Sequence, residues 1–139
     1  MKVFIDTNIM IDFLENRQPF ASDAIRIFEL SALGQIELFV SDLTIANVRY
    51  ITQKIIPLSD FYKAMKLLQD YIHITTIGEI AVRKSIQIEA HDFEDALQYF
   101  SAEQAGVDTI VTRDISDYYF SKLPIYTPSD FLKQLPAYR

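Results

Sequence analysis

Short apolar runs alternate along this chain with longer segments in which apolar residues recur every three or four positions. Uninterrupted apolar runs are typical of buried strands, whereas the longer period is typical of amphipathic helices. The predicted strands are Lys2–Ile5, Ile36–Val40, Ile72–Ile77, Thr109–Thr112 and, at one edge, Pro124–Tyr126.

Helical periodicity fills the intervals between these runs. Ser41, Asp92 and Thr127 have the side chains expected of N-caps, and Gly34 and Gly106 are placed to end helices. The predicted helices run from Asp6 through Leu14, from Pro19 to about Leu33, from Ser41 through Ile51, from Pro57 through Leu68, over Glu79–Glu89, from Asp92 to near Gly106, and over Pro128–Leu135.

Strands separated by helical segments form βαβ units, in which the strands run parallel and the helices cover the sheet. The sequence therefore predicts an α/β fold, a three-layer α/β/α sandwich with a central parallel sheet. Because no repeat, low-complexity tract or linker interrupts the pattern, we expect residues 1–139 to form a single domain.

Composition narrows the possible functions. The net charge of −6 argues against a protein that coats nucleic acid through a basic face. It is compatible with a nuclease, because carboxylates gathered around a divalent cation make a protein acidic. The absence of Cys excludes disulfides, thiolate metal sites and Cys nucleophiles. The apolar run in MKVFIDTN is too short for a signal peptide or a membrane span, so we expect a cytoplasmic protein without a membrane partner.

Four acidic residues fall at one predicted edge of the sheet. Asp6 directly follows the first strand, and Asp114 and Asp117 follow the strand Thr109–Thr112. Asp95 lies in the first turn of the preceding helix, which a right-handed crossover brings to the same edge. Ligands of open parallel sheets gather outside the carboxyl ends of the strands. We therefore expect these four carboxylates to converge.

Converging carboxylates repel one another unless a proton or a cation compensates their charge. Oxygen ligands without His or Cys favour Mg²⁺ or Mn²⁺ over zinc. Such ions orient a water, lower its pKa and stabilise charge developing on a phosphodiester. The pattern thus indicates metal-assisted hydrolysis.

Four segments together resemble the PIN-domain family. VFIDTNIMIDFL is similar to its first strand and motif, SDLTIANVRYI to its third helix, DFEDALQYFSAEQAGVDTIVTRDISDY to its second half, and LPIYTPSDFL to its tail. The segments span nearly the whole chain in the expected order. DTN alone is a weak signal, but its combination with EDALQ and IVTRD at this spacing is a strong one.

The resemblance implies a compact α/β/α sandwich, often a homodimer, and metal-dependent cleavage of RNA. It also implies the toxin half of a VapBC-type toxin–antitoxin pair, neutralised by a small antitoxin protein. Matched by position, the catalytic and metal-binding acids fall on four residues, and the polar supporting positions on Asn8 and Thr112. The acids are Asp6, Asp95, Asp114 and Asp117.

The third helix departs from the family pattern, because Asn47 stands where the family usually has Glu. An amide oxygen can bind a metal but brings no negative charge, so we expect weaker cation binding and reduced activity. Asp92 lies three residues before Asp95 and could compensate, although Asp92-Phe-Glu-Asp95 is a better match to a capping box.

Two other functions remain open. The first is a catalytically weak or inactive PIN-fold module that binds RNA or a protein partner. The second is a phosphoryl-transfer domain of the receiver or haloacid-dehalogenase kind. The chain matches the dehalogenase pattern poorly because position 8 is Asn, and it lacks the paired acids after the first strand and the Lys after the last strand that a receiver needs.

Side chains outside these motifs are given mostly structural interpretations. His73 and His91 lack metal-ligand spacing and are interpreted as surface or satisfied residues. Arg113 is a candidate for RNA phosphate contact, whereas Arg49 and Lys54 fit a solvated face equally well. Leu67, Leu68, Tyr71 and Ile72 are interpreted as core, with a dimer or partner surface as the alternative.

Overall fold

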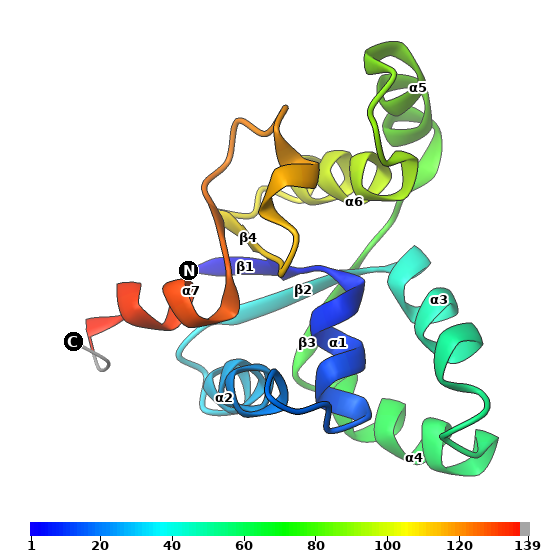
Figure 1. Ribbon diagram of the computed structural model, residues 1–139, viewed down its shortest axis with the longest axis vertical. Helices are drawn as coiled ribbons and strands as arrows, with labels where there is room; N and C mark the ends of the chain where they lie inside the picture. The colour runs from blue at the N-terminus through cyan, green and yellow to red at the C-terminus, as the bar shows by residue number, and fades with distance from the viewer. Residues whose placement is uncertain (137–139) are drawn as a thin grey trace.

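The computed structural model describes residues 1–136, in which strands and helices alternate as the sequence predicts (Figure 1). The strands are β1 (Lys2–Ile5), β2 (Glu37–Ser41), β3 (Ile72–Thr75), β4 (Thr109–Val111) and β5 (Ile125–Tyr126). The α-helices are α1 (Thr7–Leu14), α2 (Ala21–Ala32), α3 (Asp42–Thr52), α4 (Leu58–Leu68), α5 (Gly78–Ile88), α6 (Phe93–Gln104) and α7 (Pro128–Gln134); η1 (Ile115–Tyr118) is a 3₁₀ turn.

The five strands form one sheet in the order β3-β2-β1-β4-β5, and every neighbouring pair is parallel. β1 is central: Phe4 is opposite Phe39 of β2 on one side and Ile110 of β4 on the other. Strand order therefore reverses at β1, so the chain after β1 and the chain after β4 leave the sheet side by side at its carboxyl edge. The predicted parallel α/β sandwich is confirmed.

Alternate residues of β1 supply the two sides of the core, as expected of a strand buried on both faces. Val3 and Ile5 pack with α1, α2, α3, α4 and α7, while Phe4 packs with Tyr99 of α6 and Tyr118 of η1. Figure 1 shows the corresponding layers, with α1, α2 and α4 below the sheet and α5 and α6 above it.

Several details differ from the sequence predictions. The helix expected from Pro19 begins at Ala21, and the strand expected to reach Ile77 ends at Thr75, before the positive-φ Gly78. The core interpretation holds for Leu68 and Ile72, which are buried, and is wrong for Leu67 and Tyr71. Leu67 is 71% exposed on a side of α4 that no described element covers, and Tyr71, in the turn between α4 and β3, is 47% exposed.

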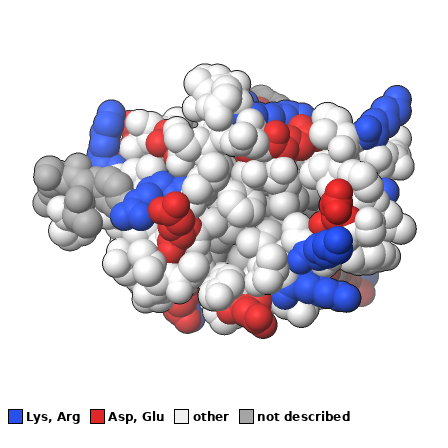
Figure 2. Space-filling view, turned by 90° about the horizontal axis from the view of Figure 1, so that it is seen from below, with Lys and Arg blue, Asp and Glu red and all other residues white. Residues whose placement is uncertain are grey.

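Charged residues of both signs surround an uncharged centre on the face below the sheet, over α2 and α4 (Figure 2). Neither sign forms a continuous surface there. Within residues 1–136, every helix is too short or too polar to cross a bilayer.

Candidate active site

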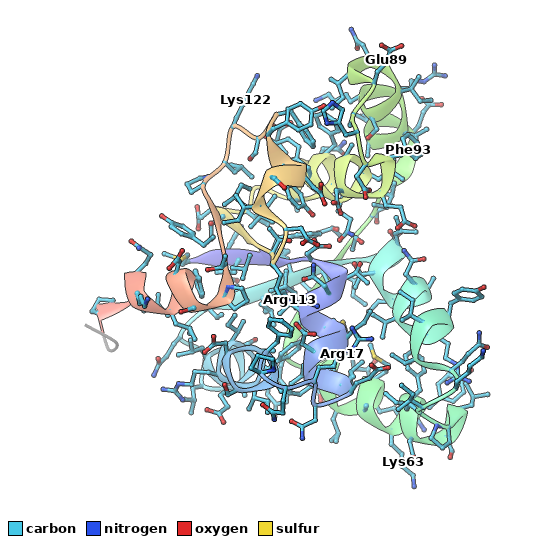
Figure 3. All side chains as sticks on the ribbon, viewed as in Figure 1. Arg17, Lys63, Glu89, Phe93, Arg113 and Lys122 are labelled. Atoms are coloured by element: carbon cyan, nitrogen blue, oxygen red, sulfur yellow. The ribbon has the colours of Figure 1, made fainter. Side chains whose placement is uncertain are left out.

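The carboxyl ends of β1 and β4 meet the N-terminal end of α6. Asp6 is the N-cap of α1 directly after β1, and Asp114 precedes η1 after β4. Figure 3 labels Phe93 at the start of α6 and Arg113 just after β4, on either side of this edge. This position agrees with the sequence prediction, because Asp6 and Asp114 each follow a strand and Asp95 lies in the first turn of the crossover helix.

Asp95 and Asp117 form the tightest part of the acidic cluster together with Asp92. One carboxylate oxygen from each of the three lies within 4.8 Å of the others. Burial raises the pKa of Asp95 to about 8, and the negative charges of Asp6, Asp92 and Asp117 add to the rise. Without a compensating cation, this carboxyl therefore holds a proton at neutral pH.

Asp6 is almost fully buried and is held by donors from three elements. Its Oδ1 accepts hydrogen bonds from the Thr7 backbone at 2.6 Å and from Gln98 Nε2 at 3.2 Å, and its Oδ2 accepts one from Thr112 Oγ1 at 2.8 Å. Burial raises the pKa of Asp6, while the bonds from Thr112 and Thr7 oppose the rise. Asp6 therefore caps α1 and also lies with the acidic residues at this edge of the sheet.

Asp114 is the exposed member of the set. Its Oδ2 accepts a 3.3 Å hydrogen bond from Asn8 Nδ2, and its backbone N–H donates to Thr112 Oγ1 at 3.0 Å. Asn8 and Thr112 thus contact the acids, as expected of supporting residues. Asp114 also raises the pKa of Asp6 through its charge, which places the two carboxylates in the same site.

Gln98 is a residue that the sequence analysis missed. It is 2% exposed on α6, and its Nε2 donates to both Asp6 and Thr7, while its Oε1 accepts from Thr44 at 3.0 Å. Thr44 in turn contacts Ser41, the N-cap of α3. A polar side chain three positions after Asp95, on the same side of the helix, was the available signal.

Asn47 is half-buried on α3 and donates from Nδ2 to Glu94 Oε1 at 3.1 Å. A carboxylate from α6 therefore lies beside the position where the family has its own Glu. The predicted capping role of Asp92 is confirmed, because Asp92 Oδ1 accepts from the Asp95 backbone at 3.0 Å. Since Asp92 also lies in the acidic cluster, the cap and the ligand interpretations are compatible.

Two of the three basic candidates contact other residues of the protein, and the third, Lys54, is exposed. Arg113 forms a two-pronged ion pair with Asp12 of α1, at 2.8 and 3.2 Å, and Arg49 donates to the Ile56 carbonyl. His73 and His91 are exposed, as predicted.

The donor set fits a hard divalent cation. The clustered side chains offer only oxygen, and Asn8 Oδ1 is buried without a hydrogen-bond partner among residues 1–136. Mg²⁺ and Mn²⁺ prefer such ligands.

Fold and site together define a class: α/β proteins with a parallel sheet that carry a carboxylate cluster at the carboxyl edge. A sequence profile of the PIN domain matches residues 2–116, and the chain belongs to this family. It is 26% identical to Ribonuclease VapC1 of Aquifex aeolicus (strain VF5), over 96% of this chain and 94% of that protein.

Solved structures share the fold at lower identity. VapBC2 from Rickettsia felis, bound to a promoter DNA fragment, matches with a TM-score of 0.66 and 15% identity, over 90% of this chain and 97% of its own. The sarcin-ricin loop cleaving toxin VapC20 of Mycobacterium tuberculosis matches with a TM-score of 0.66 and 14% identity, over 88% of this chain and 98% of the toxin chain. A chain of a toxin–antitoxin complex from Klebsiella pneumoniae matches with a TM-score of 0.64 and 21% identity, over 91% of this chain and 97% of that chain.

Proposed function

We propose that this protein is a divalent-metal-dependent endoribonuclease that hydrolyses RNA phosphodiesters. The observation that carries the proposal is the meeting of Asp6, Asp95 and Asp117 from three separate elements, with the pKa of Asp95 raised to about 8. A fold rarely gathers buried carboxylates unless a cation compensates them. The similarity to Ribonuclease VapC1 supports RNA as the substrate.

Asp6, Asp95, Asp114 and Asp117 are the proposed metal ligands and catalytic residues. A divalent cation held there acidifies water and offsets the charge that develops on a phosphodiester. Thr112 and Gln98 orient Asp6, because each donates to one of its two carboxylate oxygens. Asn8 positions Asp114 through its amide. The carboxylates themselves repel RNA, so substrate binding depends on the same cation.

We further propose that the protein acts in the cytoplasm as the toxin of a type II toxin–antitoxin pair. Its structural neighbours include toxin–antitoxin complexes. A small antitoxin that covers the acidic cleft would hold the nuclease inactive. A homodimer is the proposed assembly, and residues 1–139 are the proposed single domain.

A binding module with little or no activity is the second candidate. Asn47 favours it, because an amide brings no negative charge to this position and its Nδ2 donates to Glu94. Such a module would bind RNA or a protein partner without cutting.

Cleavage of labelled RNA with Mg²⁺ or Mn²⁺, compared with an Asp6→Asn/Asp114→Asn variant, tests the proposal. We expect metal-dependent cutting that is lost in the variant and on chelation. An Asp60→Asn variant, changed on the exposed surface of α4, is the matched control. If wild type and variant are equally inactive with both metals while RNA or antitoxin binding persists, the binding module is the better description.

A further inference from the structure

A cavity of about 390 Å³ lies beside the carboxylate cluster and shares one wall, Asp114, with it. Phe20 and Arg113 line another side, and Thr127, Pro128 and Ser129 at the start of α7 complete it. The volume falls in the range of small-molecule sites. Apart from Asp114, its lining contains none of the proposed metal ligands, so its other walls are free to contact substrate.

Arg113 is fixed in the cavity wall along one edge and at one face of its guanidinium group. Asp12, which is fully buried, accepts hydrogen bonds from its Nε and one terminal nitrogen. The guanidinium carbon lies 4.1 Å from the ring centroid of Phe20. Asp12 uses two of the five N–H groups of this side chain, and within residues 1–136 no other hydrogen bond to it is found. The remaining N–H groups are available to a ligand.

Phe20 is 41% exposed although it is a large aromatic residue. It begins α2 through its backbone carbonyl, which accepts from the Ala24 N–H at 3.3 Å, so the aromatic ring itself is not needed to start the helix. Unpaired bases stack on exposed aromatic rings and on guanidinium planes, and the pair of Phe20 and Arg113 offers both.

Charge distinguishes a base from other occupants. Asp23 and Asp114 also line the cavity, so an acidic ligand is disfavoured, whereas a neutral base is not. Because Asp114 belongs both to the cavity and to the proposed cleavage site, a nucleotide beside the scissile phosphate can extend its base into the cavity.

We propose that this cavity is a subsite for one unpaired base of the RNA, next to the cleaved bond, with the base stacked on Phe20 and an edge of the base facing Arg113. The inference rests on the proposed ribonuclease function and adds to it a means of choosing the cleavage position. Base identity at this one nucleotide then affects binding.

Binding is measured with a fluorescein-labelled single-stranded RNA decamer of mixed sequence, in Ca²⁺ so that cleavage does not interfere. A series of decamers, each lacking one base, locates the stacked nucleotide. In the wild type we expect one abasic position to weaken binding roughly 5- to 150-fold, the range for loss of one base–aromatic stack. Phe20→Leu keeps apolar volume without the aromatic face and should bind all decamers with the weakened affinity. Phe20→Trp should restore the sensitivity.

Tyr50→Ala removes an aromatic side chain that is 75% exposed on α3 and is the matched control, with no expected effect. Equal effects of the abasic position in wild type and Phe20→Leu would overturn the subsite, as would the absence of any sensitive position. A third outcome would also overturn the subsite. If Phe20→Leu binds RNA as tightly as the wild type but no longer co-purifies with a small protein that accompanies the wild type, the cavity is a contact for that protein.

The subsite and the nuclease can fail separately. Phe20-dependent binding by a protein that cuts no RNA in Mg²⁺ would support the subsite and contradict the proposed activity. Metal-dependent cutting without Phe20-dependent binding would support the proposed activity and contradict the subsite.

Discussion

Gln98 donates a hydrogen bond of 3.2 Å to the buried carboxylate of Asp6 across 92 residues of sequence. The same amide group donates to Thr7, and its oxygen accepts from Thr44, so one side chain joins α6, α1 and α3. A fully buried amide with all these partners fixes the orientation of the carboxylate. The cluster therefore depends on a residue that binds no cation itself.

Replacement of Gln98 by Leu should lower the free energy of unfolding by about 1–3 kcal/mol, because Asp6 and Thr44 lose partners in a buried site. Metal affinity should fall as well, since Asp6 Oδ1 loses a side-chain donor. Urea unfolding and calorimetric titration with Mg²⁺ measure the two effects. Gln104→Leu, at the exposed end of the same helix, should change neither. Equal behaviour of the two variants would contradict the orienting role.

Stability of the metal-free protein should fall as pH rises from about 4 to 8. The pKa of Asp95 is raised from 3.8 to about 8 in the folded state, so in this window the folded protein holds a proton that the unfolded chain has released. Unfolding therefore releases a proton, and higher pH favours it. Asp95→Asn should flatten the dependence, whereas Asp70→Asn on the protein surface should not. Saturating Mg²⁺ at pH 8 should raise the unfolding midpoint of the wild type.

An Asn47→Glu variant should bind Mg²⁺ more tightly, because it restores a charge where the family has one. The same change puts a carboxylate beside Glu94 in place of a hydrogen-bond donor, so the metal-free variant should be less stable than the wild type. Calorimetry with Mg²⁺ tests the expected gain in affinity, and thermal unfolding in a chelator tests the expected loss of stability. Glu94→Gln in the same background should relieve the loss of stability. Unchanged Mg²⁺ affinity would remove Asn47 from the site.

Arg113→Met should lower the free energy of unfolding by about 3 kcal/mol, since it leaves the buried Asp12 without its partner. Arg83→Met, which breaks an exposed pair with Glu79, should cost under about 1 kcal/mol. A combined Asp12→Leu/Arg113→Met variant should recover part of the lost stability. If Arg113→Met alone is as stable as Arg83→Met, the buried ion pair contributes nothing.

Two buried tyrosines of the same core cluster should respond differently to loss of the hydroxyl. Tyr99 Oη donates to Glu103 and accepts from the Lys122 backbone, whereas Tyr118 Oη is buried without a partner in the described residues. Tyr99→Phe should cost about 1 kcal/mol and Tyr118→Phe nothing, or a slight gain. Urea unfolding decides, and a cost at Tyr118 would show that its hydroxyl donates to the neighbouring Asp6 carboxylate.

The fold and the positions of the acids were predictable because both depend on local patterns. Asp6 and Asp114 each follow an uninterrupted apolar strand, and parallel strands end at a common edge. Asp95 was placed through the crossover helix that Asp92 caps. The structure shows where these side chains lie, while their catalytic and metal-binding roles stay predictions.

Other features depend on which elements pack together, and no local pattern carries that information. Gln98 lies on α6, where residues on most sides of the helix are buried between the sheet and α5, so its spacing from Asp95 marks it as a candidate without showing which partners it meets. Leu67 has the apolarity of a core residue, but its exposure depends on what covers α4. The ion pair of Arg113 with Asp12 joins residues 101 positions apart.

Three consecutive residues after β4 each bond to a different residue at or just after the end of β1: Thr112 to Asp6, Arg113 to Asp12 and Asp114 to Asn8. The two halves of the site are thus 106 residues apart in sequence and come together where β4 pairs with β1. A break in the pairing of these two strands would separate Asp6 and Asn8 from Thr112 and Asp114 while each segment kept its own local structure. The integrity of the proposed site is therefore a property of the closed sheet and of neither segment alone.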